Sequence, residues 1–472
     1  MIKISREDIL TRNPVKIIFL LSLPLMISQL LQTLYYMADT FWLGHLPITE
    51  SGDAIAGVQI TWPIIWFFIT FSFGFGIAGV ALISQYIGSG EDNDANLVAN
   101  QMLSLSAIFG LVIAIFGFFI TPYLIPLITK STSVSSTAIA YIKLIFFGMP
   151  FIFITFAFQG ILSAKGDTVT PMYINLITVT LNIILDPFMI FGWWGLPRMK
   201  VVGAALATVI CQGFAAFISI YLLFKGTKGI KIYLDRLILK QKWIKKIIKI
   251  GLPAAIGQST TALGFVIMMA IIGRVHHSNT VLAAYGIGDK LISVIFIVID
   301  GLGMGIMTLI GQNLGAKLTT RVKEIAKKGL QIVVLVSLLE SALVFILRII
   351  LFKIFIPNRP DIAAEGAQFL TIFIWGIPFF ALAVVIMSLF RGSGHTFQPM
   401  IIDISRLWII RIPLAYLLSL KFGSTGIWWG ITLSNVIAAL IALFFYFQGE
   451  WKKQVIHDEH KEIIKPAHFL TE

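Results

Sequence analysis

Long apolar stretches recur along this chain and are separated by short polar connections that hold most of its lysine and arginine residues. Each stretch is long enough to cross the roughly 30 Å hydrocarbon layer of a bilayer as an α-helix. The pattern predicts twelve such spans. They are Lys16–Gly44, Ala54–Gly88, Asn96–Thr121, Thr137–Ala164, Thr170–Gly192, Gly203–Lys225, Ile244–Arg274, Val281–Gly315, Val322–Phe352, Ala363–Arg391, Phe397–Leu420 and Gly426–Phe447.

The first span carries a polar stripe. Its members stand at i, i+4, i+7 and i+11, a spacing that puts them on one face of an α-helix. An acid inside the membrane costs about 2.5–3.5 kcal/mol on insertion scales and is functional by default. A partner acid, a coupling ion or a water-filled cavity are the candidates that would offset this cost. The stripe consists of Ser28, Gln32, Tyr35 and Asp39.

The composition places the chain among polytopic membrane proteins. Of its 472 residues, 57% are hydrophobic and 12% are charged, with a mean hydropathy of +0.90, whereas about a quarter of the residues of a soluble domain are charged. The net charge of +13 does not indicate nucleic-acid binding, because basic residues in short connections set membrane topology. We therefore expect a multi-pass protein of the cell membrane with both termini in the cytoplasm.

Two further features bound the class of protein. We expect no cleaved signal peptide in Met1–Arg12, which lacks a short apolar core followed by small residues. The single cysteine, Cys211, excludes an intramolecular disulfide and is expected only to pack.

The two halves of the chain resemble each other. Proline, glycine and glutamine residues recur in the same order at an offset of 229, or within two residues of it, which indicates an internal duplication. Because each half has six spans, the halves have the same orientation, and parallel repeats place the substrate site between the lobes. The matched pairs include Pro24 and Pro253, Gln29 and Gln258, Gly44 and Gly273, Gly57 and Gly286, Gln85 and Gln312, and Pro150 and Pro378.

The duplication predicts four segments. Residues 1–225 form an amino-terminal six-helix lobe, and residues 244–449 form a carboxy-terminal six-helix lobe. Residues 226–243 form a basic cytoplasmic linker loop between the lobes. Residues 450–472 form a cytoplasmic tail.

The two six-span halves and several short motifs in a fixed order resemble the MATE family (multidrug and toxic compound extrusion). The resemblance covers nearly the whole chain and is closer to the archaeal and DinF-like pattern than to the NorM-like one. The motifs are the Pro24–Asp39 segment, Ala56-Gly57, Gly148-Met149-Pro150-Phe151, Lys165-Gly166-Asp167 with Thr168 and Pro171, Asp186-Pro187, and Gly203-Ala204-Ala205-Leu206-Ala207-Thr208.

The resemblance implies a cation-coupled antiporter that exports amphipathic, often cationic drugs in exchange for protons or sodium ions. It implies an amino-lobe coupling site formed by Asp39, Asn182, Asp186 and Thr208, which is also the candidate Na⁺ site. It also implies that Gln32 and Tyr35 line the cavity below this site.

The chain departs from the NorM-like pattern, in which helices 7 and 10 carry acids of a carboxyl-lobe cation site. We expect no such acid in span seven or in span ten, and Met268 stands 229 residues after Asp39. Cation coupling is therefore expected in the amino lobe.

The depth of the two acids supports a shared site without reference to any family. Asp39 lies about 23 residues into an outward-running helix and Asp186 about 16 residues into another, which places both in the outer half of the membrane. Two carboxylates in a poorly solvated pocket do not both ionise cheaply, so one of them is a candidate proton carrier. Their oxygens, with the Asn182 amide one turn away, are equally suited to Na⁺. The alternative is that each acid only bonds to a neighbouring helix.

For several other residues, a structural role is an alternative to a functional one. Pro24 removes a hydrogen bond inside the first span, so this helix either bends during transport or holds a static kink. Tyr36 and Met268 are candidates for an adaptable substrate wall, although such residues often only pack. Asp300 is a candidate cleft residue or a packing acid. A structural role is expected first for three charged residues, Asp403, Arg406 and Arg411.

The sequence leaves alternative functions open. A flippase for lipid-linked or amphipathic metabolites would use a similar two-lobe fold with a basic central cavity. An ion channel would conduct without needing a proton or sodium gradient. No Gly-x-x-x-x-Gly-Lys-Ser/Thr loop is present, which argues against an ATP-driven pump. We expect no enzyme, no cofactor beyond the coupling ion and no nucleic-acid partner, but a monomer that acts on small amphipathic molecules in the lipid bilayer.

Overall fold

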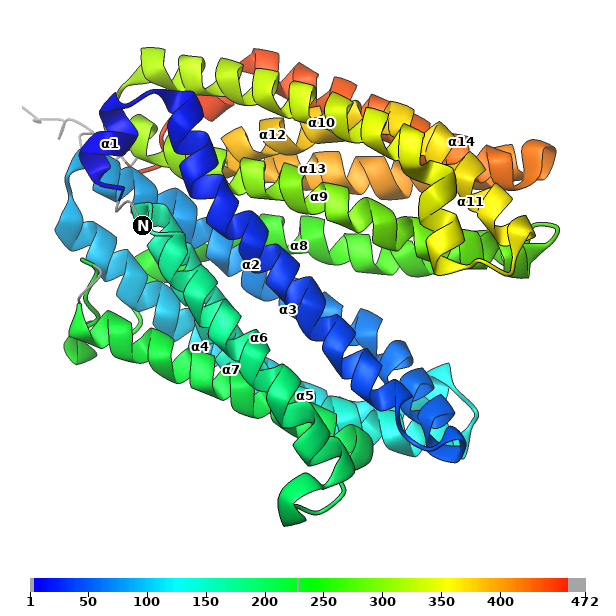
Figure 1. Ribbon diagram of the computed structural model, residues 1–472. Coiled ribbons are helices and arrows are strands. Elements are labelled where there is room, and N and C mark those ends of the chain that lie inside the picture. Colours follow the sequence, from blue (N-terminus) through cyan, green and yellow to red (C-terminus); the bar gives the residue numbers. More distant parts are fainter. Residues whose placement is uncertain (1–3, 227–228, 457–472) are drawn as a thin grey trace, which may run out of the picture.

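The computed structural model describes residues 4–226 and 229–456, and the regular elements of this part are all helices (Figure 1). The all-helical prediction is confirmed. The predicted tail beyond residue 456 and residues 227–228 of the predicted linker lie outside the described residues. The helices of eight or more residues are α2 (Pro14–Gly44), α3 (Ile48–Ser89), α4 (Asp92–Ile128), α5 (Thr132–Lys165), α6 (Val169–Phe191), α7 (Lys200–Lys225), α8 (Gln241–Ile272), α9 (Ser278–Gly315), α10 (Thr319–Phe355), α11 (Pro360–Phe373), α12 (Ile377–Ser393), α13 (Phe397–Ile404) and α14 (Ile412–Gln448).

Eleven helical stretches in the described residues are long and apolar enough to cross a membrane. Ten of them correspond to the first ten predicted spans. The eleventh, Phe397–Gln448, has 52 residues, which would extend roughly 78 Å and far exceed the thickness of a bilayer. It contains α13, the π-helix η4 (Ser405–Arg411) and α14.

This last stretch reverses direction at Gly423. The backbone there has φ 58° and ψ −136°, a region that is essentially restricted to glycine. Helix segments on the two sides of Gly423 then pack against each other, because a Cβ placed on Gly430 would lie 2.6 Å from Ala415 Cα. The stretch is therefore a hairpin, and its two arms are the eleventh and twelfth predicted spans.

We expect the substitution Gly423→Ala to destabilise the protein by about 1–3 kcal/mol, because an alanine is strained in this backbone conformation. Thermal unfolding of the purified protein measures the effect. Gly52→Ala is the matched control, since a Cβ at Gly52 meets nothing within 4 Å and its φ is not positive. Equal unfolding temperatures for the two variants would show that the reversal does not depend on glycine.

Helix α2 links the two halves of the fold. It begins with Pro14 at its first position, and the Asn13 side chain accepts a hydrogen bond from the Val15 backbone N–H (2.9 Å), a favourable helix start. Near this start, Ile18 is buried with helices α9–α14, whereas Leu43 near the other end is buried with helices α3–α7. The helix therefore begins in one hydrophobic core and ends in the other.

Figure 1 shows two helix bundles that lie together near the N-terminus and diverge towards the opposite end. One hydrophobic core is formed mainly by α3–α7 and the first turns of α8. The other is formed mainly by α8–α14 together with the start of α2. We refer to these groups as the amino bundle and the carboxyl bundle.

The bundles are joined near the N-terminus by two similar contacts. Gln85 of α3 donates a hydrogen bond to the backbone carbonyl of Gly392 (3.2 Å). Gln312 of α9, its partner in the repeat, donates one to the carbonyl of Ala164 (2.7 Å). Both glutamines are fully buried. In each bundle, therefore, the glutamine at the same repeat position donates a hydrogen bond to a backbone carbonyl near the end of a helix in the other bundle.

Candidate functional site

Four predicted residues come together inside the amino bundle. Asp39 is on α2, Asn182 and Asp186 are one turn apart on α6, and Thr208 is on α7. Thr208 Oγ1 donates to Asp39 Oδ2 at 3.4 Å, and Asn182 Nδ2 donates to Asp186 Oδ1 at 3.2 Å. All four residues are buried, with at most 8% of their surface exposed. Three helices thus bring polar side chains to one apolar interior.

The two acids are neighbours. The carboxyl group of Asp186 acts electrostatically on that of Asp39, and each acid is hydrogen-bonded to a neutral partner, Thr208 or Asn182. Two carboxylates in a poorly solvated site do not both ionise cheaply. A proton or a cation bound between them would relieve their repulsion.

Several oxygens of the site have no partner in the structure. Buried polar atoms are normally hydrogen-bonded, and exceptions call for an explanation such as a bound ion, a proton or water. Carboxylate, amide and hydroxyl oxygens are ligands for hard cations. This oxygen set therefore fits a small hard cation or a proton. The unpartnered atoms are Asp39 Oδ1, Asn182 Oδ1, Asp186 Oδ2 and Tyr35 Oη.

A pocket lies next to this site along α2. Gln32, Tyr35 and Tyr36, all within two turns of Asp39, line it, and Tyr35 also lies beside Thr208. The pocket therefore adjoins the acidic pair through Tyr35. Its other lining residues, contributed by α3, α5, α6 and α7, are Ile69, Ile152, Thr155, Phe156, Gln159, Asn175, Thr178, Val179, Gln212 and Ala215.

Three amides of this lining were missed by the sequence analysis. Gln159, Asn175 and Gln212 lie in the fourth, fifth and sixth predicted spans, and Gln159 donates to Asn175 at 3.3 Å. An amide side chain inside an apolar span was the signal that would have singled them out. They give the pocket both hydrogen-bond donors and acceptors.

Aromatic rings stand beside the pocket. Tyr36 contacts Trp62 edge to face, with ring centroids 4.5 Å apart, and Trp62 stacks on Trp66 at 5.7 Å. Aromatic faces attract cations and apolar rings alike. The arrangement suits an amphipathic cation.

The remaining predicted site residues lie elsewhere. Ser28 has a buried hydroxyl without a partner, a turn before Gln32. Pro24 is buried within the continuous helix α2. Met268 is 2% exposed and packs in the core of the carboxyl bundle. Asp300 is also in that bundle, where its charged neighbours are Arg391, Arg406 and Asp403.

The carboxyl bundle holds a separate charged group. Arg391 and Arg406 lie 3.3 Å and 3.6 Å from the carboxylate of Asp403. Arg411, at the end of the π-helix η4, instead donates to Ser434 Oγ (2.9 Å) and Asn435 Oδ1 (2.7 Å) of α14. The first two arginines are paired with an acid, whereas the third is held by neutral partners.

The expectation that span ten contains no acid is wrong. Glu365 lies at the start of this predicted span, and its carboxylate accepts a hydrogen bond from Trp428 Nε1 (2.9 Å). The carboxyl bundle therefore contains acids, but it has Met268 at the repeat position where the amino bundle has Asp39.

The family model MatE matches this chain twice, over residues 24–188 and over residues 253–417. The chain belongs to the MATE family. Both ends of the second match lie 229 residues after those of the first, from 24 to 253 and from 188 to 417, which is the offset found in the sequence. The family consists of multidrug efflux transporters of the membrane, so a multi-pass transporter that is not an enzyme is confirmed.

Full-length relatives agree with this assignment. The probable multidrug resistance protein YoeA of Bacillus subtilis is 26% identical over 92% of this chain and 93% of its own. The probable multidrug resistance protein NorM of Thermotoga maritima is 29% identical over the same shares. A solved structure described as the outward-facing conformation of a multidrug resistance MATE family transporter has a TM-score of 0.87 at 23% identity, covering 95% of this chain and 98% of its own. The MATE fold is thus shared over nearly the whole chain.

Proposed function

We propose that this MATE transporter is a multidrug antiporter that exports amphipathic, often cationic compounds in exchange for protons or sodium ions entering the cell. The observation that carries the proposal is the buried Asp39–Asp186 pair with unpartnered oxygens next to a polar and aromatic pocket. Binding a proton, an ion or a positive charge of the substrate would offset the burial cost of such an acid pair.

The proximity of the two sites supports coupling by competition. Tyr35 lines the pocket and also borders the acidic pair. A cation that enters the pair removes the negative charge that attracts a cationic drug, and a bound drug raises the cost of taking up the ion. Binding of one therefore weakens binding of the other, which is the linkage that antiport requires.

The helix that carries Asp39 is suited to transmit this change. Pro24 interrupts the hydrogen-bond ladder of α2, and α2 packs against α6 of the amino bundle and α9 of the carboxyl bundle. We propose that protonation of Asp39 or Asp186 alters its bonds to Asn182 and Thr208 and biases α2 between straight and bent states. The pocket narrows as α2 bends, which expels the drug.

The sidedness of the chain completes the proposal. We propose that both termini are cytoplasmic. The basic connections, including the loop between α7 and α8, lie at the same end of the bundles as the N-terminus, and basic connections are typical of the cytoplasmic side. The bundles are joined at the N-terminal end through Gln85 and Gln312 and diverge at the other end (Figure 1). On this topology the conformation described here is outward-facing.

Arg411 favours a second candidate, a flippase for lipid-linked or amphipathic metabolites. Within the described residues no carboxylate lies within ion-pair distance of this guanidinium, and its partners are neutral. A permanent positive charge in the carboxyl bundle would suit the anionic headgroup of a lipid. The antiporter and the flippase differ in their substrates, since the first exports drugs in exchange for ions and the second moves lipids between leaflets.

Efflux of ethidium from proteoliposomes under an imposed proton or sodium gradient tests the proposal. We expect efflux above the leak rate with one gradient and none when that gradient is collapsed by an ionophore. A fluorescent anionic lipid in the same vesicles is expected to stay in its leaflet. Gradient-independent ion flux would indicate a channel, and lipid movement without drug efflux would favour the flippase.

A further inference from the structure

The segment that follows α7 is held firmly against α4. Residues 231–240, here called the docked segment, form backbone hydrogen bonds with three amide side chains of α4. The predicted linker is therefore a fixed surface of the amino bundle over these residues. The bonds join Lys231 N to Asn96 Oδ1 (2.8 Å), Tyr233 N to Asn100 Oδ1 (2.8 Å), Lys240 N to Gln101 Oε1 (2.7 Å), and Gln101 Nε2 to the carbonyls of Arg236 and Ile238 (2.8 Å each).

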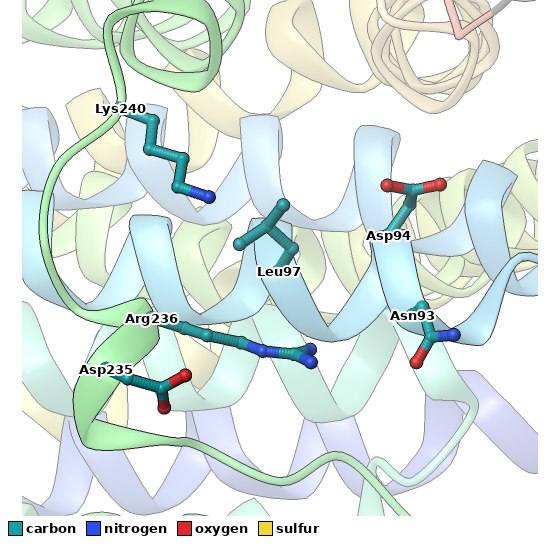
Figure 2. A pocket seen from close by; sticks show the side chains of 6 residues that line it. All are labelled: Asn93, Asp94, Leu97, Asp235, Arg236 and Lys240. Carbon is teal, nitrogen blue, oxygen red and sulfur yellow. The ribbon is translucent and has the colours of Figure 1, made fainter.

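A pocket of about 430 Å³ lies between the docked segment and the first turns of α4, a volume in the range of ligand-binding pockets. Figure 2 shows Arg236 and Lys240 extending from the docked segment towards α4. The Tyr233 ring lies 4.9 Å from the guanidinium carbon of Arg236 and restricts its position. The lining residues are Asn93, Asp94, Leu97, Asp235, Arg236 and Lys240.

The charges around this pocket are balanced but not paired. It has two cations, Arg236 and Lys240, and two carboxylates, Asp94 and Asp235. Among these four lining residues no ion pair within 4 Å is formed in the described structure. A ligand with one positive and one negative group therefore complements the pocket better than a ligand with a single charge.

Apolar side chains flank the charged groups. Leu234 is 74% exposed and Ile238 is 73% exposed on the docked segment. This segment connects the ends of α7 and α8, two helices that are long and apolar enough to cross a membrane, and a connection between two such helices is expected at the surface of the bilayer. Exposed leucine and isoleucine beside basic residues are typical of elements that insert into the interface between lipid headgroups and acyl chains.

We propose that this pocket binds the headgroup of phosphatidylethanolamine, a phospholipid with one phosphate and one primary ammonium group. Arg236 and Lys240 contact the phosphate, Asp94 and Asp235 accept hydrogen bonds from the ammonium, and the acyl chains lie against Leu234 and Ile238. A choline headgroup has the same charges but no N–H donor, and a glycerol headgroup has no cation. The pocket therefore distinguishes ethanolamine from both.

Native mass spectrometry of the full-length protein tests this proposal. The protein is incubated with equal amounts of phosphatidylethanolamine, phosphatidylcholine and phosphatidylglycerol that have the same acyl chains. We expect the ethanolamine lipid to be retained preferentially. Replacing both Asp94 and Asp235 by asparagine is expected to lower that preference about fivefold, since two weak, exposed interactions with the ammonium are lost. Arg236→Gln is expected to reduce retention of all three lipids.

Asp92→Asn is the matched control, because Asp92 is an exposed acid in the same first turn of α4 and does not line the pocket. Equal retention of the three lipids by the natural protein overturns the proposal whatever the variants do. Preferential retention of phosphatidylglycerol overturns it in favour of a merely basic surface. An unchanged lipid preference in the double variant also overturns it. Lipid retention is measured without drug efflux. A failure of this proposal can therefore be told apart from a failure of the proposed transport function.

Discussion

Asp39→Asn is expected to reduce gradient-driven drug efflux at least tenfold, to the level of empty vesicles. An asparagine keeps the shape of the side chain and its contact with Thr208, but it neither takes up a proton nor carries a negative charge. Asp186→Asn is expected to have the same effect, because we propose that the two neighbouring carboxyl groups bind the coupling ion together. Efflux from proteoliposomes under the effective gradient is the measurement.

The pH dependence of drug binding distinguishes a coupling role from a structural one. In the natural protein, affinity for a cationic dye is expected to fall as the pH is lowered, because protons neutralise the acids that attract the dye. In Asp39→Asn the affinity is expected to be lower and nearly independent of pH. Asp92→Asn, which changes an exposed acid far from the pair along the chain, should behave like the natural protein. Normal efflux by both Asp39→Asn and Asp186→Asn would overturn the amino-lobe mechanism.

Gly315→Ala is expected to open the junction between the bundles. A Cβ on Gly315 would lie 1.9 Å from the backbone carbonyl oxygen of Gln85, and a Cβ on Gly88 would lie 2.0 Å from that of Gln312. Backbone atoms do not move aside as side chains do, so the bundles must separate at this end. Overpacking of this kind costs about 1–3 kcal/mol, enough to shift a two-state equilibrium about tenfold.

Spin labels on the two bundles measure this shift. With Cys211, the single cysteine, replaced by serine, cysteines at Asp92 of α4 and Thr320 of α10 report the distance across the junction. We expect the long-distance population to increase in Gly315→Ala, and efflux to fall with it. Gly286→Ala is the control, because a Cβ there meets nothing within 4 Å. A distance distribution identical to that of the natural protein would show that the junction tolerates the added methyl group.

The same junction explains why the repeat retains its glutamines and glycines. Gln85 and Gln312 bind carbonyls at the ends of α12 and α5, and Gly88 and Gly315 allow α3 and α9 to approach closely. These positions are therefore shared architecture of the two lobes. The acid at position 39 is not shared, since Met268 takes its place in the carboxyl bundle.

The sequence by itself determined the multi-span helical class, the duplication and the polar stripe of the first helix. These are local or periodic features, because crossing a bilayer requires about 20 apolar residues and an acid among them has a large burial cost. The family match over residues 24–188 and 253–417 agrees with the duplication. The contact of Asp39 with Thr208, 169 positions away, was predicted only through the resemblance to the family.

The tertiary structure decided which polar residues face each other. Gln159, Asn175 and Gln212 share a pocket because of how α5, α6 and α7 are rotated, and helix rotation depends on packing between elements distant in sequence. The predicted linker likewise proved to be docked on α4 through amides more than 130 positions away. Periodicity shows that a side chain shares a face with its neighbours along one helix, but only the packed bundle shows what that face meets.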